Sequence, residues 1–352
     1  MDNPFLKNGY LLQKASLNLL PLSGAADTAK ARCSSATVGR KVCAFLRAQG
    51  EHADGDWRVA FARCLDDPAR AGGARAVAEA IADDIADILW TLRRGGGPAV
   101  RPDWTAAQWE YWRGVDSFCL AGGLLSGRLG EIVVDRVRLA CAGRGLGGAR
   151  VRLAPHPGLV SLLGAARYAA RRETEALVVD FGHSYIKRGA LRREAGRPVL
   201  HVQQAIPAQW TQWTFPSDAE ERQAAAALHD HMVQALVDLD RQTGAACRTV
   251  IVSVANYVQD GCVVERGGYG KLRLLGARYD RVLQDALSAR LGRPVNVHLL
   301  HDGTAGAYGV QGAYWRHEAF IGFGTSLSVG FPCAQMDFPF ACAVVQDGRC
   351  PP

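Results

Sequence analysis

The stretch 176–190, ALVVDFGHSYIKRGA, constrains the fold more than any other part of the sequence. An apolar run over 177–179 ends at Asp180, and an alternating run begins at Tyr185 after a turn that contains Gly182. Two β-type runs joined by a short glycine turn predict a hairpin. A carboxylate at the end of a buried strand, beside outward-facing backbone N–H groups, can hold Mg²⁺ next to a phosphate. Taken alone, the stretch is better explained as an ordinary hairpin. Motifs elsewhere in the sequence must decide whether it also forms a Mg²⁺ and phosphate site.

The region 176–315 alternates between strand and helix patterns. Three strands come first, and helix, strand, helix, strand and helix follow. Beyond the first hairpin, strands are predicted at 199–206, 249–257 and 295–300, and helices at 216–241, 278–291 and directly after His301-Asp302. This order predicts an α/β fold with a mixed sheet. A second glycine hairpin at 320–331 has the layout of the first, which indicates two related lobes that face one cleft.

The N-terminal third reads as helical. Residues 28–65 carry apolar side chains at helical spacing, and 74–93 shows the strongest helical periodicity in the chain. Asp83, Asp84 and Asp87 fall largely on the polar side of this second helix. We therefore expect them to face solvent and not to form a carboxylate site.

Two glycine-rich segments lie between these regions. A strand predicted to end at Ala121 is followed by Gly122-Gly123, which lets a flat ligand or a phosphate approach the backbone closely. The helix predicted at 158–172 contains Gly164 followed by two alanines, so it can pack closely against a neighbour.

Composition excludes several classes of protein. The net charge is +7, but the basic residues occur as singles and pairs without interleaved aromatic residues, so we predict no nucleic-acid binding. An anionic substrate fits the sign of the charge equally well. No apolar run approaches the roughly 20 residues of a transmembrane helix, so we expect no membrane association. The first ten residues lack a basic-then-apolar signal, which favours a cytoplasmic protein.

The ten cysteines are scattered and form no CxxC pair. Several, such as Cys119, lie inside apolar runs. This pattern predicts buried thiols in a reducing cytosol, and neither a zinc site nor a disulfide framework.

Three motifs bear on one chemistry: DFGHSYIKRG at 180–189, HDGTAGAYG at 301–309 and GFGTSLSVG at 322–330. They resemble the phosphate-1, connect and phosphate-2 motifs of the actin, sugar kinase and Hsp70 ATPase superfamily, and most closely those of ROK-type sugar kinases. The matching positions are Asp180, Gly182, Ser184, Ile186, Lys187, Gly189, Asp302, Gly324 and Thr325. His183, Ser326 and Ser328 replace glycines of the family, and His301 stands where asparagine is usual.

The order of the motifs departs from the family. The adenosine motif and a small-residue helix normally come last, whereas LAGGLLSG and GLVSLLGAARYA here precede the first phosphate motif. The resemblance therefore implies a circularly permuted, two-lobed actin-like ATPase fold of the ribonuclease H-like type. It places 1–157 plus 316–352 in a large lobe and 158–315 in a small α/β lobe.

The resemblance also implies ATP and Mg²⁺ as cofactors and a role for each motif. Asp180 would hold Mg²⁺, and Asp302 would act as the general base on an attacking hydroxyl. The implied phosphate-binding residues are Gly182, His183, Ser184, Lys187, Gly324, Thr325 and Ser326. The implied adenosine-binding residues are Gly122, Gly123 and Leu124. Candidate acceptor contacts are Asn256, Gly268 and His301.

Three candidate functions can be compared with these residues. The first is an ATP-dependent kinase for a small sugar, cyclitol or similar polyol. The second is an acceptor-independent ATPase or a catalytically weak nucleotide-binding regulator of the same superfamily, which the non-glycine residues His183 and Ser326 support. The third, a Rossmann-like binding protein, lacks a G-x-G-x-x-G after a strand.

Several points stay open at this stage. His183 either caps its loop or contacts phosphate. The ROK zinc motif is absent, since Cys33 lies alone near its expected place. The identity of the acceptor and the oligomeric state, a homodimer included, are also open.

Overall fold

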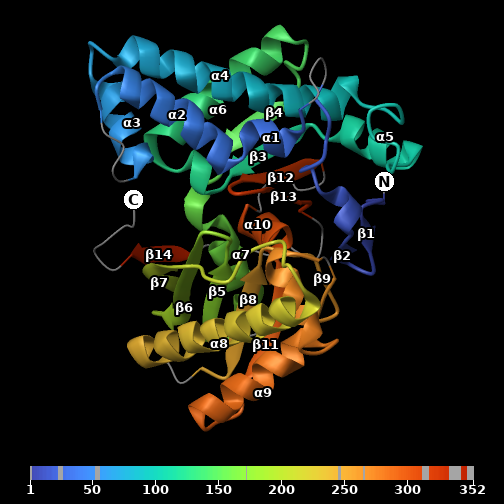
Figure 1. Cartoon of the computed structure of the whole chain (residues 1–352), viewed down its shortest axis with the longest axis vertical. Helices are drawn as coiled ribbons and strands as arrows, with labels where there is room; N and C mark the ends of the chain where they lie inside the picture. The colour runs from blue at the N-terminus through green and yellow to red at the C-terminus, as the bar shows by residue number, and fades with distance from the viewer. Residues whose placement is uncertain are drawn as a thin grey trace.

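Two β-sheets, one in each half of the molecule, organise the chain (Figure 1). The computed structural model describes residues 2–22, 27–51, 56–171, 173–244, 247–264, 266–310, 317–332 and 342–346. Helices pack against both sheets, and the predicted mixed α/β architecture is confirmed.

The larger sheet has six strands in the order β11-β8-β5-β6-β7-β14. Their bounds are β5 (Ala176–Phe181), β6 (Tyr185–Glu194), β7 (Arg197–Pro207), β8 (Thr249–Val254), β11 (Asn296–His301) and β14 (Ala343–Gln346). The strands β5, β6 and β7 form an antiparallel meander, and β8 and β11 extend it in parallel with β5. The hairpin predicted around Gly182 is therefore β5–β6.

Helices cover both faces of this sheet. On one face Leu177 and Val179 pack with α8 (Asp218–Thr243) and α9 (Tyr279–Leu291). On the other face Val178 packs with α7 (Val160–Ala170). Because β5 is buried on both sides, it reads in the sequence as a continuous apolar run instead of an alternating one.

The long helix α8 has a start and an end that its sequence specifies. Ser217 is its N-cap, and the Ser217 hydroxyl accepts the backbone N–H of Glu220 at 3.3 Å. The helix ends at Gly244, whose φ of +58° is the left-handed conformation that glycine adopts most readily. The helix predicted at 216–241 is confirmed as α8.

The smaller sheet has four strands in the order β13-β12-β3-β4. Their bounds are β3 (Ser117–Ala121), β4 (Arg150–Leu153), β12 (Glu318–Phe323) and β13 (Leu327–Gly330). The strands β12 and β13 form an antiparallel hairpin, and β3 and β4 lie parallel to β12.

Helices from the N-terminal part of the chain cover this sheet (Figure 1). They are α1 (Ala29–Cys33), α2 (Ser35–Ala48), α3 (Trp57–Asp66), α4 (Ala71–Trp90), α5 (Ala106–Gly114) and α6 (Gly127–Gly143). A π-helical turn, Thr91–Gly95, extends α4. Shorter elements are β1 (Leu6–Lys7), β2 (Tyr10–Leu11), β9 (Val258–Gln259), β10 (Cys262–Val263) and the 3₁₀ turns Gln13–Ala15, Gly123–Leu125, Pro157–Leu159 and Gly268–Leu274.

The helices α7 and α10 (Asp302–Gly309) join the two halves (Figure 1). A Cβ on Gly164 of α7 would lie 1.7 Å from the carbonyl oxygen of Ala305 in α10. Reciprocally, a Cβ on Gly309 would lie 2.1 Å from the carbonyl oxygen of Val160. The predicted close packing through small residues is confirmed, because only glycine permits this approach at both positions.

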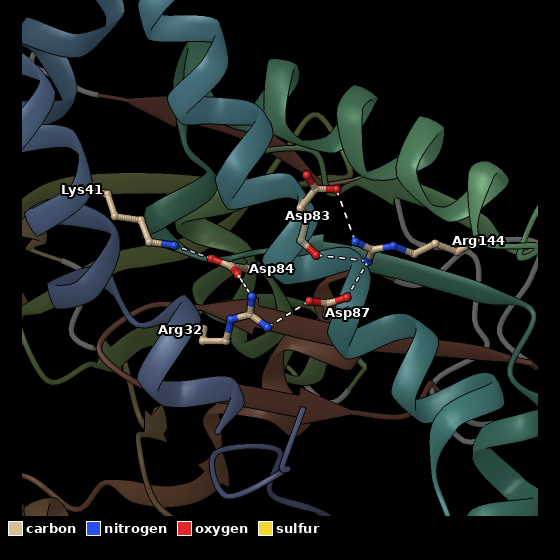
Figure 2. Close-up of polar contacts among 6 residues, drawn as sticks. All are labelled: Arg32, Lys41, Asp83, Asp84, Asp87 and Arg144. Carbon is tan, nitrogen blue, oxygen red and sulfur yellow. Dashed lines mark hydrogen bonds and ion pairs between the residues drawn. The ribbon is translucent and has the colours of Figure 1, made fainter. Parts of the chain in front are cut away.

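The expectation that all three acids of α4 face solvent is wrong for Asp84, which is buried (Figure 2). The Asp84 carboxylate pairs with Arg32 at 2.7 Å and with Lys41. Arg32 also reaches Asp87 at 2.9 Å. The periodicity of α4 alone does not show that α1 and α2 bring two cations onto this face.

A second expectation fails at the C-terminal end. Residues 343–346, expected in the large lobe, form β14 and pair in parallel with β7 of the six-stranded sheet. β14 pairs with the edge strand β7 through main-chain hydrogen bonds. The order of elements in the sequence does not determine which sheet edge a terminal strand joins.

The prediction of buried thiols holds for five of the eight cysteines that the structure describes. Cys33, Cys64, Cys119, Cys141 and Cys247 are buried thiols, and burial raises the pKa of Cys141 and Cys247 to about 11. Across the described ranges, no helix has both the length and the apolar content needed to cross a bilayer.

Candidate functional site

A cavity of about 450 Å³ lies where the carboxyl ends of β3, β5, β8, β11 and β12 converge. Every predicted site residue lines it except Gly268. These residues are Gly122, Gly123, Leu124, Asp180, Gly182, His183, Ser184, Lys187, Asn256, His301, Asp302, Gly324, Thr325 and Ser326. Segments far apart in the sequence thus share one wall, so the two hairpins and both acids can contact a single ligand.

Asp180 lies at the end of β5 in a polar row that crosses three strands. Lys187 of β6 is its antiparallel partner and Ser253 of β8 its parallel partner. The Ser253 hydroxyl donates to Oδ1 at 3.0 Å, and the Lys187 ammonium donates to Oδ2 at 3.2 Å. Because Asp180 is buried, these contacts give both of its carboxylate oxygens a hydrogen-bond partner and fix the direction of the side chain.

Asp302 begins α10, and its neighbour His301 orients it. The Nδ1 atom of His301 accepts the backbone N–H of Thr304 at 3.2 Å, so His301 caps α10. The proton of a neutral imidazole then lies on Nε2, which is 3.0 Å from Oδ1 of Asp302. The Gly303 N–H donates to the same oxygen at 2.7 Å. Oδ2 has no partner among the described residues and is available to a ligand.

The imidazole of His301 is also held by stacking. It lies on the ring of Tyr257 with centroids 4.4 Å apart and planes 15° apart. His301 thus uses one ring nitrogen to cap α10 and the other to face Asp302.

The two glycine hairpins meet across the cavity. The hydroxyls of Ser184 and Thr325 lie 3.1 Å apart and form a hydrogen bond. A Cβ on Gly324 would meet nothing closer than the carbonyl oxygen of Ser326 at 3.7 Å, so packing within the protein does not require glycine there. The space that a side chain would fill opens into the cavity, which suits close contact between a phosphate and the backbone.

Aromatic rings hold His183 in place. It stacks on Trp213 with centroids 5.5 Å apart, and the edge of Tyr269 packs against it. Burial lowers the pKa of His183 below its ordinary 6.5, so the ring is neutral at pH 7. Its Nε2 is buried without a partner in the described part of the chain, so ring stacking, and not a loop-capping bond from Nε2, holds the side chain.

Gly268 acts on His183 instead of lining the cavity. Its φ is +51°, and a Cβ there would lie 2.8 Å from Nε2 of His183. Gly268 therefore leaves room for the imidazole, and unlike the other predicted site residues it does not line the cavity.

The two glycines after β3 have different roles, since Gly122 is required by packing and Gly123 leaves space in the cavity wall. Gly122 has a φ of +103°, and a Cβ there would lie 2.1 Å from the carbonyl oxygen of Phe323, so glycine is required by strand packing. Its N–H donates to the carbonyl of Pro157 at 2.9 Å. Gly123 has no atom within 4 Å of a built Cβ, so it opens the cavity wall to a ligand.

Sequence analysis missed several residues that line the cavity, among them Asn18, Ser35, Arg58, Trp213 and Tyr257. Asn18 pairs with the backbone of Leu327, whose N–H donates to Oδ1 at 2.8 Å. Its amide donates back to the Leu327 carbonyl at 3.3 Å. No local signal marks these positions, because each reaches the cavity only through long-range packing.

The donor set suits Mg²⁺ that is bound together with a phosphate. Asp180 and Asp302 line the same cavity, and Mg²⁺ commonly takes one or two carboxylates, keeping water and phosphate oxygens as its other ligands. Within the described ranges, no three His, Cys, Asp or Glu side chains gather as a closed metal cage. The residues present therefore fit Mg²⁺-ATP.

Comparison with known proteins adds little to this geometry. No protein-family model matches the chain, and no curated protein matches it. Among solved structures, it is similar to a ROK hexokinase from Thermus thermophilus, with 16% identity and a TM-score of 0.25 over 38% of this chain and 37% of that one. It is also similar to RuvC from Thermus thermophilus, with 14% identity and a TM-score of 0.20 over 39% of this chain and 79% of that one. The match thus spans well under half of the hexokinase.

Proposed function

We propose that the protein is an ATP-dependent phosphotransferase that moves the γ-phosphate to a hydroxyl of a sugar or cyclitol-like molecule. The observation that carries this proposal is that Asp180, Asp302 and both glycine hairpins line one cavity. Phosphoryl transfer requires positioning and charge neutralisation more than covalent help, and this set of residues supplies both.

On the donor side, the backbone N–H groups of the two hairpin turns bind the β- and γ-phosphates. Bound Mg²⁺ neutralises charge on the phosphate oxygens, and Asp180 and Lys187 are the residues that hold the Mg²⁺-ATP complex. Gly123 and Leu124 admit the adenosine. Closure of the two lobes, whose hairpins touch through Ser184 and Thr325, would exclude water from the terminal phosphate.

On the acceptor side, Asp302 takes the proton from the attacking hydroxyl through its unpartnered Oδ2. His301 and Gly303 donate to Oδ1 and so hold the carboxylate in one orientation. Asn256 and His301, which also line the cavity, contact the acceptor.

The same proposal includes a circularly permuted, two-lobed actin-like fold of the ribonuclease H-like type. Its support is the equal arrangement of the strands β6-β5-β8-β11 and β13-β12-β3-β4, each a hairpin extended by two parallel strands. In the second set the parallel strands precede the hairpin in the chain. The lobes are 158–315 and 1–157 with the 318–330 hairpin, and β14 joins the former.

The second candidate is an acceptor-independent ATPase or a catalytically weak nucleotide-binding regulator. The observation that favours it is that His183 and Ser326, which replace family glycines, both line the cavity. Their side chains occupy space near the hairpin turns and could weaken phosphate binding.

The deciding experiment measures ADP release with and without a panel of sugars and cyclitols, for the native protein and for Asp302→Asn. The asparagine keeps an acceptor for His301 and Gly303 but removes the base. We expect one acceptor class to stimulate ADP release, and the substitution to lower that stimulated rate by about 10²- to 10⁴-fold. Acceptor-independent turnover that survives the substitution would favour the ATPase and rule out the kinase.

A further inference from the structure

Arg58, the second residue of α3, lines the cavity from the helical half of the molecule. The phosphotransfer scheme above does not use its charge. Within the described part of the chain, the charged side chains that line the cavity are Arg58, Asp180, Lys187 and Asp302, with two histidines beside them. Lys187 pairs with Asp180 within the cavity lining, whereas the acid that pairs with Arg58, Asp56, lies outside the lining.

The guanidinium of Arg58 is oriented but only partly bonded. Its Cζ lies 4.6 Å from the centroid of the Trp57 ring, and its Nη1 donates to Oδ1 of Asp56 at 3.3 Å. That oxygen is shared, because it also accepts the backbone N–H of Arg58 at 2.9 Å as the cap of α3. The Nε atom is buried without a partner among the described residues. Nε therefore lacks an acceptor within the protein, and the side chain must turn toward the cavity before Nε can donate to a ligand.

The surrounding contacts place Arg58 near the second hairpin. Trp57 packs on α2, since its Nε1 would lie 3.2 Å from a Cβ on Gly39. Ser35, at the start of α2, lines the cavity and donates its N–H to the carbonyl of Gly324 at 2.7 Å. In the described ranges its hydroxyl forms no hydrogen bond, so it adds a free donor beside the same wall.

We propose that Arg58 is an oxyanion-binding residue of the cavity, which takes a phosphate or carboxylate group of a bound ligand. A guanidinium with a free edge matches two oxygens of such a group in a bidentate manner, which an ammonium cannot do. This inference rests on the proposed function, because the oxyanion belongs either to the ATP phosphates or to an acidic polyol acceptor. The second source agrees with the basic net charge of the chain.

Binding calorimetry tests the assignment without requiring turnover. The probes are ATP, ADP, inorganic phosphate and D-gluconate, with neutral sorbitol for comparison. The variants are Arg58→Gln, which removes the charge, and Arg58→Lys, which keeps the charge but not the fork. Arg63→Gln is the matched control, because Arg63 is exposed on the same helix and lies outside the cavity. Thermal melts confirm that each variant is folded.

We expect Arg58→Gln to weaken the binding of at least one anionic probe by about tenfold or more, with Arg58→Lys recovering little of the loss. A loss for ATP, ADP or phosphate assigns Arg58 to the donor, and a loss for gluconate alone assigns it to the acceptor. Arg63→Gln and sorbitol binding should not change. Wild-type affinity in both Arg58 variants, or a native protein that binds none of the anionic probes, overturns the proposal. Binding through Arg58 without phosphate transfer would refute the kinase and leave Arg58 as an oxyanion residue.

Discussion

The turns after β5 and β12 share one backbone design and differ in charge. The sequence 180–182 is Asp-Phe-Gly, and the corresponding 322–324 is Gly-Phe-Gly. In the first hairpin Asp180 pairs across the strands with Lys187, and in the second Gly322 pairs with Ser328. At the same point of the two sheets, one hairpin thus carries an ion pair and the other carries two small neutral residues.

The parallel neighbours continue this difference. Asp180 lies beside Ser253 of β8, whereas Gly322 lies beside Ala121 of β3. A Cβ on Gly322 would lie 2.4 Å from the Ser328 hydroxyl, so a side chain at 322 would displace that hydroxyl. If the cavity binds Mg²⁺-ATP as proposed, the first hairpin would supply the charged side chains, while the second would supply neutral donors and space.

Removing the charge of Asp180 from the first hairpin should lower the rate of ADP formation more than any other change to the two hairpins. Asp180→Asn keeps the shape of the polar row but removes the carboxylate that the proposed Mg²⁺-ATP complex requires. We expect Mg²⁺-dependent ADP formation to fall by about 10²- to 10³-fold, the usual loss for one preorganised electrostatic group. Coupled-enzyme measurement of ADP across a Mg²⁺ titration provides the test.

The control for this substitution is Asp135→Asn, since Asp135 is an exposed acid on α6 that pairs with Arg138. It changes the net charge equally and should leave the rate unchanged. If Asp180→Asn kept the native Mg²⁺ dependence, the difference in charge between the hairpins would have no catalytic meaning.

Alanine at the turn glycines Gly182 and Gly324 should have an intermediate effect on ATP affinity, and its effect on stability should differ between the two hairpins. A Cβ on Gly324 meets only an ordinary contact, so Gly324→Ala should leave thermal stability within about 0.5 kcal/mol and weaken ATP binding by about tenfold. A Cβ on Gly182 lies 3.0 Å from the Tyr185 carbonyl oxygen, so Gly182→Ala should also lower stability, by about 1 kcal/mol. Native ATP affinity in Gly324→Ala would show that its open space does not hold phosphate.

The two hairpins also show what the sequence can predict. Their strands and turns follow local rules, since a buried strand reads as an apolar run and a tight turn requires small residues. The positions of Asp180 and Asp302 at strand ends follow from the same pattern. Their convergence on one cavity was expected from the resemblance and agrees with the geometry.

Residues that depend on packing between distant segments could not be predicted. Arg58 and Asn18 reach the cavity only because α2, α3 and the N-terminal segment fold over the second hairpin. Asp84 is buried because α1 and α2 cover a side of α4 that periodicity marks as polar. Gly268 has its effect through His183, a contact between segments 85 positions apart in the sequence.

The smallest expected effect tests whether the two hairpins act together. The bond between Ser184 and Thr325 joins exposed side chains, so its net contribution to stability should be about 0.5–1 kcal/mol. A double-mutant cycle of Ser184→Ala and Thr325→Val, followed by denaturant unfolding, isolates this coupling energy. If ATP draws both turns onto one triphosphate, the coupling measured from ATP affinities should exceed the value from unfolding. Strict additivity in both measurements would mean that the charged and the neutral hairpin bind phosphate independently, although they touch.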